Sequence, residues 1–271
     1  MGLRVQVGVL SGGSAWEREF RAVWSREQRF LRQYAERRES PVDRKAAEIV
    51  PEKLIETLRK AFAKAQGLVF DKGSGFICQV SGEDRRLQTY QVQAYAAGLR
   101  EDRKRLRAFS RTAGRAGWGS AAFSGTVGMG MGLLGIALPD VPLFAAVLLK
   151  SVYETAASFG FSCREETERI YALRIIEAAL SYGGELETRS RELDGYAQTG
   201  VWQTPADLET QISETARKLS EVMLYGKALQ SVPVAGAIGG LGDAVCLRRV
   251  QRYAAIKYEK RFLICRRQAA E

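Results

Sequence analysis

The chain contains an unbroken stretch of 24 residues without a charge, from 116 to 139, which constrains its fold more than any other feature. The stretch is long enough to span a bilayer, which takes about 20 residues. Its glycines leave it only mildly hydrophobic, and each would cost an exposed helix about 1 kcal/mol relative to alanine. A helical segment here must therefore be buried. It fits a hairpin inside a soluble protein or a hairpin that enters a membrane, and it fits a single membrane span least well.

Small residues recur every three or four positions along this stretch, and a second uncharged stretch, residues 228–242, repeats the pattern. Such a stripe lets the backbone of another helix approach closely. We therefore predict two glycine-rich apolar hairpins, whose helix-packing positions are Gly117, Gly125, Gly128, Gly132, Gly135, Gly236 and Gly240.

The letters from Gly130 to Gly135 also match the dinucleotide-binding pattern GxGxxG. That fingerprint needs a preceding strand and a helix long enough to hold a pyrophosphate at its N-terminus. Pro139 follows the last glycine after four residues, so helix packing is the favoured interpretation. The chain also lacks a P-loop sequence, and we predict no cofactor.

The formal net charge of +10 is concentrated in two short segments, each beside an uncharged stretch. Residues 100–115 carry +5 and residues 248–267 carry +7, so the rest of the chain is at −2. Cations beside an apolar segment are typical of proteins that bind anionic membranes, at about 1 kcal/mol per side chain. The residues predicted to bind a membrane or another anion are Arg100, Arg103, Lys104, Arg105, Arg107, Arg111, Arg115, Arg248, Arg249, Arg252, Lys257, Lys260 and Arg261.

The same basic segments also fit a plain solvated helix face or a nucleic-acid site. Phe109 is the one aromatic residue within 100–115, so the stacking platform of single-strand binders is missing there. We therefore rank nucleic acid below an anionic membrane surface or a membrane-protein partner. The sequence leaves the oligomeric state open.

Histidine is absent, which excludes Ser-His-Asp catalysis and histidine-based zinc sites, and no metal is predicted. Four charged residues lie within or beside the apolar segments: Asp140, Lys150, Glu154 and Asp243. Lys150 and Glu154 stand four residues apart, so we expect them to pair on one helix face. An internal ion-pair cluster is the favoured interpretation of the four. A catalytic or metal-binding carboxylate pair, Asp140 with Asp243, is the alternative.

Helical spacing of apolar residues runs through most of the remaining chain, and no segment indicates a convincing sheet. The sequence therefore predicts an all-α fold. We expect an N-terminal leader and charged helix within 1–40 and a single helical domain over 41–271. A basic helix at about 244–267 ends this domain.

Local signals predict several helix ends. Gly160 is expected to stop the helix that follows the first uncharged stretch, and Ser162 with Glu165 has the spacing of a capping box for the next helix. The glycines within 183–200 indicate a polar loop, after which Thr204-Pro205-Ala-Asp207 is expected to start another helix.

The four cysteines are far apart in sequence and form no CxxC pair. This usage favours reduced thiols in a cytosolic protein over a secreted disulfide framework. The first residues lack the long apolar run of a signal peptide. We therefore expect a cytoplasmic location with peripheral association to the cytoplasmic membrane.

An ordered set of motifs resembles the EcsC family of bacterial proteins. The set includes Pro51-Glu-Lys-Leu, Leu138-Pro-Asp-Val-Pro142 at the end of the glycine-rich stretch, residues 145–152 with Gly160-Phe161, and residues 232–240 before the basic helix. The resemblance covers about 50–265. It implies a protein linked to an ABC-type transporter operon and to secretion, with no established activity or catalytic residues.

Together these observations favour a non-enzymatic accessory protein, held on a membrane by basic segments and glycine-rich hairpins. The second hypothesis is a soluble helical enzyme or ligand-binding protein that uses the Asp140, Lys150, Glu154 and Asp243 cluster. The third hypothesis is a nucleic-acid-binding protein, whose affinity would fall steeply with salt.

Overall fold

The structure is a computed structural model of the chain, and it describes residues 14–36, 140–205, 207–230 and 239–268 with eight single positions between 56 and 111. Its regular elements within these ranges are helices, which confirms the predicted all-α class. The helices are α1 (Ala15–Gln33), α8 (Asp140–Ser158), α9 (Glu166–Leu180), α10 (Gly183–Thr199), α11 (Leu208–Gln230) and α12 (Gly239–Gln268). None of these described helices is both long and apolar enough to cross a membrane.

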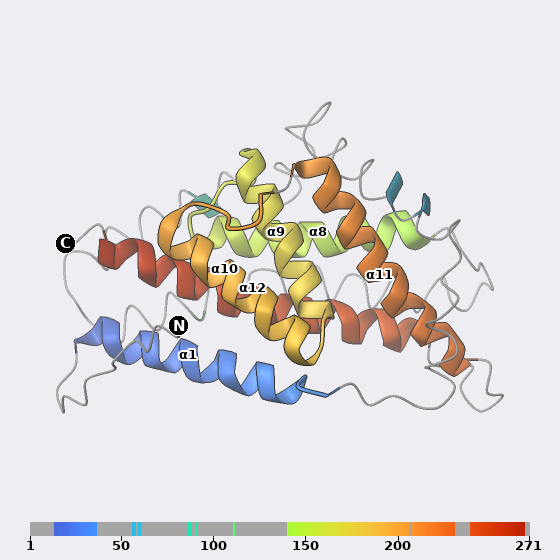
Figure 1. The fold of residues 1–271 in the computed structure, drawn as a ribbon, viewed down its shortest axis with the longest axis horizontal. Coiled ribbons are helices and arrows are strands. Elements are labelled where there is room, and N and C mark those ends of the chain that lie inside the picture. Colours follow the sequence, from blue (N-terminus) through green and yellow to red (C-terminus); the bar gives the residue numbers. More distant parts are fainter. Residues whose placement is uncertain are drawn as a thin grey trace.

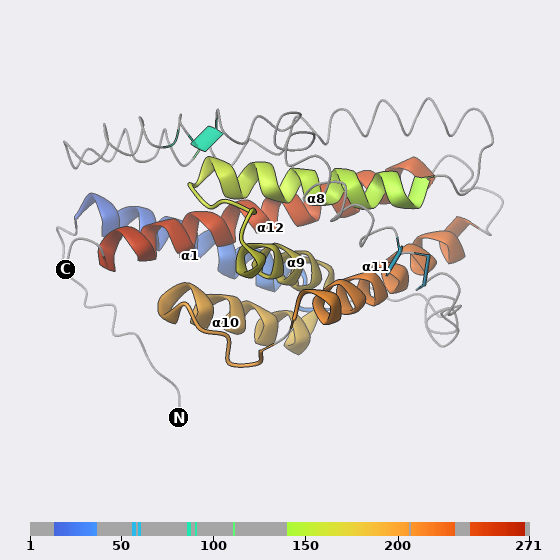
Figure 2. The same cartoon turned by 90° about the horizontal axis from the view of Figure 1, so that it is seen from above.

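Helix α12 is the axis around which the other helices pack (Figures 1 and 2). Its 30 residues correspond to about 45 Å. It contacts α1, α8, α9, α10 and α11, and it buries the large rings of Tyr253, Tyr258 and Phe262 among them. Because neighbours cover most of its central turns, most of the polar side chains there are enclosed as well.

Helix α9 is the second buried helix, and it packs against α8, α10, α11 and α12. All of its residues from Ile170 to Leu180 are buried, including the charged Arg174 and Glu177. A helix covered on all sides has no polar face to predict from periodicity.

Helix α1 lies along one side of α12 and runs antiparallel to it (Figure 1). Trp16 Nε1 donates to the carbonyl of Leu263 at 2.8 Å, whereas Gln33 at the other end of α1 accepts from Arg252 at 2.7 Å. Phe30 is fully buried, with its ring centroid 4.7 Å from that of Tyr253. The N-terminal charged helix thus shares one hydrophobic core with the rest of the described fold.

Two of the predicted helix ends are confirmed. Helix α8 ends just before Gly160, whose φ of +88° and close contact with the Tyr90 ring leave no room for a side chain. Helix α11 begins after Asp207, whose Oδ1 accepts from the backbone N–H of Thr210 at 2.7 Å.

Two other predictions of local structure are wrong. Helix α9 begins at Glu166, and Ser162 Oγ accepts from the nearby N–H of Arg164 at 3.4 Å instead of capping the helix. Residues Gly183–Thr199 form helix α10 instead of a polar loop. The glycines lie mostly at its two ends, while Leu186, Leu193 and other residues at helical spacing bury one face.

Candidate functional site

The basic residues predicted between 248 and 267 lie on α12, and most of them are enclosed by protein. Lys257 and Lys260 are 1% and 6% exposed, Arg249 is 6% exposed, and the Arg261 side chain is 12% exposed. The prediction that this whole segment faces an anionic surface is therefore corrected for these four residues, because burial in the helical body removes them from it. The predicted α12 residues that are exposed are Arg248 and Arg252.

Lys257 and Lys260 form a closed cluster with one carboxylate of α1 and one of α10, which we call the lysine cluster. Lys257 Nζ donates to Glu27 Oε1, to Asp194 Oδ1 at 2.7 Å and to the carbonyl of Ser190 at 2.9 Å. Lys260 Nζ donates to the other oxygen of each carboxylate, Glu27 Oε2 and, at 2.7 Å, Asp194 Oδ2. Two cations and two carboxylates balance, and the cluster ties α1 and α10 to α12.

The lysine cluster sets the ionisation of its own members. Burial raises the pKa of Glu27 more than any one neighbour lowers it, but Lys257 and Lys260 together lower it to about 2. Burial lowers the pKa of Lys257, and the attraction of Asp194 and Glu27 overcomes this and raises it well above its usual range. Lys257 is therefore a charged, fully hydrogen-bonded ammonium at neutral pH and not an amine nucleophile.

The two arginines that flank this cluster on α12 are held by aromatic rings. Arg261 Nη1 donates to Glu168 at 2.7 Å, and its guanidinium carbon lies 4.2 Å from the centroid of the Phe161 ring. The guanidinium carbon of Arg249 lies 3.7 Å from the centroid of the Tyr34 ring. Such stacking on aromatic faces stabilises a cation within the fold and leaves little of it for a ligand.

A second buried network joins α9 to α10 and α11. Glu177 Oε2 accepts from Arg189 Nη1 and from Gln211 Nε2, each at 2.8 Å, while its Oε1 has no partner among the described residues. Burial raises the pKa of Glu177, and the attraction of Arg189 does not overcome it. The environment of Glu177 therefore stabilises the ionised carboxylate less than the environment of Glu27 does.

The outward side of α1 presents arginines around a tryptophan. Trp24 is 51% exposed, and three arginines of the same helix are exposed around it. Glu17 is the single exposed carboxylate of α1, because its other two carboxylates, Glu19 and Glu27, are buried at 3% and 1% exposure. We call this surface the arginine face; it consists of Arg21, Trp24, Arg29 and Arg32.

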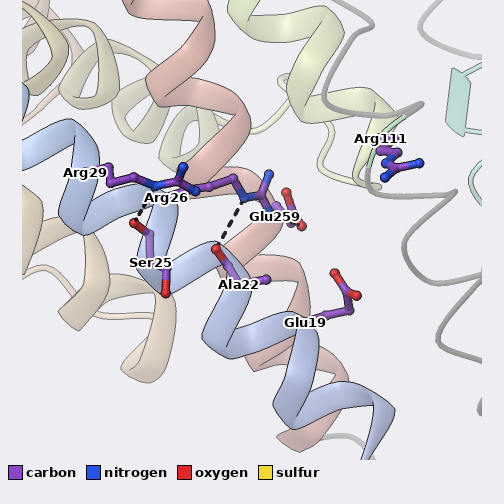
Figure 3. A pocket seen from close by; sticks show the side chains of 7 residues that line it. All are labelled: Glu19, Ala22, Ser25, Arg26, Arg29, Arg111 and Glu259. Atoms are coloured by element: carbon purple, nitrogen blue, oxygen red, sulfur yellow. Dashed lines mark hydrogen bonds and ion pairs between the residues drawn. The ribbon is translucent and has the colours of Figure 1, made fainter.

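A hollow of about 290 Å³ lies between α1 and α12 and reaches across to Arg111 (Figure 3). Arg26 Nη2 donates to Glu259 Oε1 at 2.6 Å on one wall, and the Glu259 side chain is 0% exposed. Figure 3 shows the Glu19 and Glu259 carboxylates on the side of the hollow that faces Arg111. The residues that line it are Glu19, Ala22, Ser25, Arg26, Arg29, Arg111 and Glu259.

The predicted pairing of Lys150 with Glu154 is confirmed, at 3.7 Å between Nζ and Oε1, and Arg86 lies 3.6 Å from the same oxygen. Asp140 opens α8, so 14 residues of continuous helix, about 21 Å, separate it from Glu154. The four-residue pocket on which the enzyme hypothesis rested is therefore not formed. Asp243 lies in the first turns of α12, and its side chain and that of Asp140 lie outside the described residues.

Most of the other predicted positions also lie outside the described residues. Arg111 is an exposed helical residue at the hollow, and Gly240 is the second residue of α12. Within the described ranges, no three Cys, Asp or Glu side chains gather in the manner of a metal site. The predicted residues that are not described are Arg100, Arg103, Lys104, Arg105, Arg107, Arg115, Gly117, Gly125, Gly128, Gly132, Gly135 and Gly236.

Sequence reasoning missed the residues of α1 and α10 that matter most here. Glu27 and Asp194 were not singled out, because nothing local distinguishes them from surface carboxylates. Trp24 carried a usable signal, since it stands three residues after Arg21 and eight before Arg32, and the helix turn of about 100° per residue directs it away from Val23 and Phe30.

A family model described as the EcsC protein family matches residues 17–263. The match begins within α1 and ends within α12, so it includes both helices that build the hollow and the lysine cluster. No curated protein and no solved structure gives a match.

Proposed function

The chain belongs to the EcsC protein family, and we propose that it is a non-enzymatic accessory protein bound peripherally to the cytoplasmic face of an anionic membrane. The observation that carries this proposal is the arginine face of α1. An exposed tryptophan among exposed arginines is the pattern of a surface that rests at the lipid headgroups, with its aromatic ring at the interface.

The charge of the arginine face arises from the way α1 is packed. The helix contains five arginines and three glutamates, and the fold turns two of the glutamates, Glu19 and Glu27, inward. Arg21, Arg29 and Arg32 are left at the surface with no carboxylate partner among the described residues. At about 1 kcal/mol for each cation near an anionic headgroup, these three contribute about 3 kcal/mol.

The lysine cluster has a supporting role in this proposal. It joins Glu27 on the inner side of α1 to Lys257 and Lys260, and so holds the helix with its arginine face outward. The basic residues of α12 thus orient the docking helix from inside the protein. The segment 100–115 and the uncharged stretch after it remain the second predicted contact with the membrane.

Co-sedimentation with lipid vesicles tests the proposal. We expect the protein to pellet at low salt with vesicles of equal parts phosphatidylglycerol and phosphatidylcholine, and to be released by high salt. It should not bind vesicles of pure phosphatidylcholine. The variant Trp24→Ser should weaken binding at least tenfold, because the ring loses its place at the interface. Val201→Ser, which changes an apolar residue that is 67% exposed outside the arginine face, is the matched control and should bind normally.

Two results would overturn the proposal. The first is a folded protein that stays in the supernatant with phosphatidylglycerol vesicles at low salt. The second is equal loss of binding in Trp24→Ser and Val201→Ser, because the arginine face would then have no special part. A protein that binds only vesicles containing membrane proteins would instead indicate a protein partner and would reject direct lipid binding.

A further inference from the structure

The hollow between α1 and α12 is lined by two kinds of hydrogen-bonding group (Figure 3). The cationic donors include Arg29 from the arginine face and Arg111 from the basic segment 100–115, which Figure 3 shows at opposite ends of the group. The carboxylates of Glu19 and Glu259 also line it. Residues that are 82 positions apart in the chain thus converge on one small cavity.

The arginines Arg29 and Arg111 have N–H donors that no described residue accepts. Arg29 Nε donates to the backbone carbonyl of Ser25 at 3.3 Å, and the described residues contain no carboxylate that pairs with either Arg29 or Arg111. Two guanidiniums held apart across a cavity are suited to the tetrahedral oxygens of a phosphate group, which accept hydrogen bonds from several directions.

The carboxylate of Glu259 has one oxygen that accepts no hydrogen bond from the described residues. Arg26 satisfies Glu259 Oε1, but Glu259 Oε2 has no hydrogen-bond partner among the described residues, although the residue is fully buried. A buried carboxylate oxygen without a donor is costly, and a ligand that supplies an O–H group removes that cost. The carboxylate therefore selects for a hydroxyl beside the phosphate.

We propose that this hollow binds a phosphate ester that carries a neighbouring hydroxyl group, such as a glycerol phosphate headgroup. This inference rests on the proposed membrane function, for which it names the headgroup. Arg29 and Arg111 take the phosphate oxygens, and a glycerol hydroxyl donates to Glu259 Oε2. Arg29 belongs to both the arginine face and the hollow, so a headgroup can enter from the docked surface.

The decisive experiment compares two anionic lipids of equal charge, phosphatidylglycerol and phosphatidylmethanol, each mixed equally with phosphatidylcholine. Phosphatidylmethanol is a phosphate diester without a hydroxyl, so the difference between the two lipids measures the contribution of the hydroxyl donor. We expect about tenfold tighter binding to phosphatidylglycerol vesicles, which is the range for a hydrogen bond to a charged group. Equal binding to both would overturn the headgroup site and leave membrane docking standing, whereas binding to neither would overturn docking itself.

Three variants assign the effect to the hollow. Glu259→Gln should abolish the preference for phosphatidylglycerol, because an amide oxygen is a weaker acceptor than a carboxylate, and circular dichroism checks that it folds. Arg29→Gln changes an exposed residue and should weaken binding to phosphatidylglycerol more than to phosphatidylmethanol. The matched control is Arg32→Gln, also exposed on α1 but outside the hollow, which should weaken binding to both lipids equally. The site would be rejected if Glu259→Gln folds and retains the preference for phosphatidylglycerol. It would also be rejected if Glu259→Gln fails to fold and Arg29→Gln retains the full preference.

Soluble ligands separate a lipid headgroup from a free phosphate ester. The probes are sn-glycerol 3-phosphate and inorganic phosphate, added to the full chain in a thermal unfolding assay. Stabilisation by glycerol phosphate alone, lost in Arg29→Gln, supports the site and shows that it also takes the free ester. Stabilisation by neither, with the vesicle preference intact, supports the site for the membrane-held headgroup. Equal stabilisation by both ligands would overturn the role of the hydroxyl.

Discussion

Helices α1 and α12 lie side by side and are both rich in basic residues, yet they place their charges in opposite ways. Helix α12 buries Lys257 and Lys260, and it also buries the Glu259 carboxylate, which pairs with Arg26 of α1. Helix α1 buries two of its three glutamates, Glu19 and Glu27, and leaves arginines such as Arg21 and Arg32 exposed. The two helices are complementary at this contact, since the buried Glu27 of α1 pairs with the buried Lys257 and Lys260 of α12.

The difference follows from position in the bundle. Helix α12 has five neighbouring helices in the described part of the fold, so most side chains in the middle of the helix are enclosed. Helix α1 contacts α12 and α10 among the described helices, so one of its sides is open. The local density of basic residues therefore does not locate a binding surface. The number of neighbours around a helix decides whether its cations stabilise the fold or are available to a partner.

The largest expected effect comes from removing a buried cation of α12. Lys257→Met should lower the free energy of unfolding by about 3–5 kcal/mol, because Glu27 and Asp194 would remain in the interior with Lys260 as their single shared lysine. Chemical unfolding in urea, monitored by circular dichroism, measures the change.

The control for Lys257→Met is Arg248→Met, which changes an exposed cation of the same helix. We expect it to alter stability by no more than about 0.5 kcal/mol. Equal effects of the two substitutions would break the comparison, since buried and exposed cations of α12 would then be equivalent.

The same cluster can be opened from the α1 side. Glu27→Gln should lower the free energy of unfolding by about 3 kcal/mol, which corresponds to the difference between its pKa of about 2 and the ordinary value of 4.5. Glu177→Gln is the contrasting variant. Its buried carboxylate has a raised pKa, so the neutral amide should leave stability unchanged or increase it. A larger loss in Glu177→Gln than in Glu27→Gln would refute this ranking of the two buried acids.

Much of the fold was accessible from sequence because its signals are local. Gly160 and Asp207 mark helix ends through the conformation or cap of a single residue, and the pairing of Lys150 with Glu154 depends only on helical spacing. The all-α class follows from the periodicity of apolar residues. Helix α10 was missed because the glycines near its ends outweighed the spacing of Leu186 and the residues after it.

The candidate site was accessible only in part, for a physical reason. The partners of Lys257 in the lysine cluster, Glu27 and Asp194, are 230 and 63 residues away in the chain, and no local pattern encodes that meeting. A cluster of basic residues has the same sequence appearance whether it faces lipid or a ring of buried carboxylates. Tertiary packing separates the two cases, and it places the exposed arginines of our proposed docking surface on α1.

Lowering the pH should change the contributions of Glu27 and Glu177 to folding stability in opposite directions. The pKa of Glu27 is lowered in the folded state, so its stabilisation is complete above pH 4.5 and is lost as the pH falls toward 2. The pKa of Glu177 is raised, so its contribution improves as the pH falls toward 4.5. Urea unfolding across this range should show a steep loss of stability below pH 4.5, and that loss should be smaller in Glu27→Gln. An identical slope in the wild type and Glu27→Gln would assign the acid sensitivity to other groups.

The smallest expected effect separates binding from stability on α1. Arg32→Ala removes an exposed cation for which the described residues show no ion pair, so the free energy of unfolding should change by less than about 0.5 kcal/mol. Binding to phosphatidylglycerol vesicles should weaken about fivefold, which corresponds to about 1 kcal/mol for one cation near an anionic surface. Arg248→Ala on α12 is the matched exposed cation outside the arginine face and should have less effect on vesicle binding. If the two substitutions weaken binding equally, net charge alone would account for membrane attraction, and α1 would lose its special place in the comparison with α12.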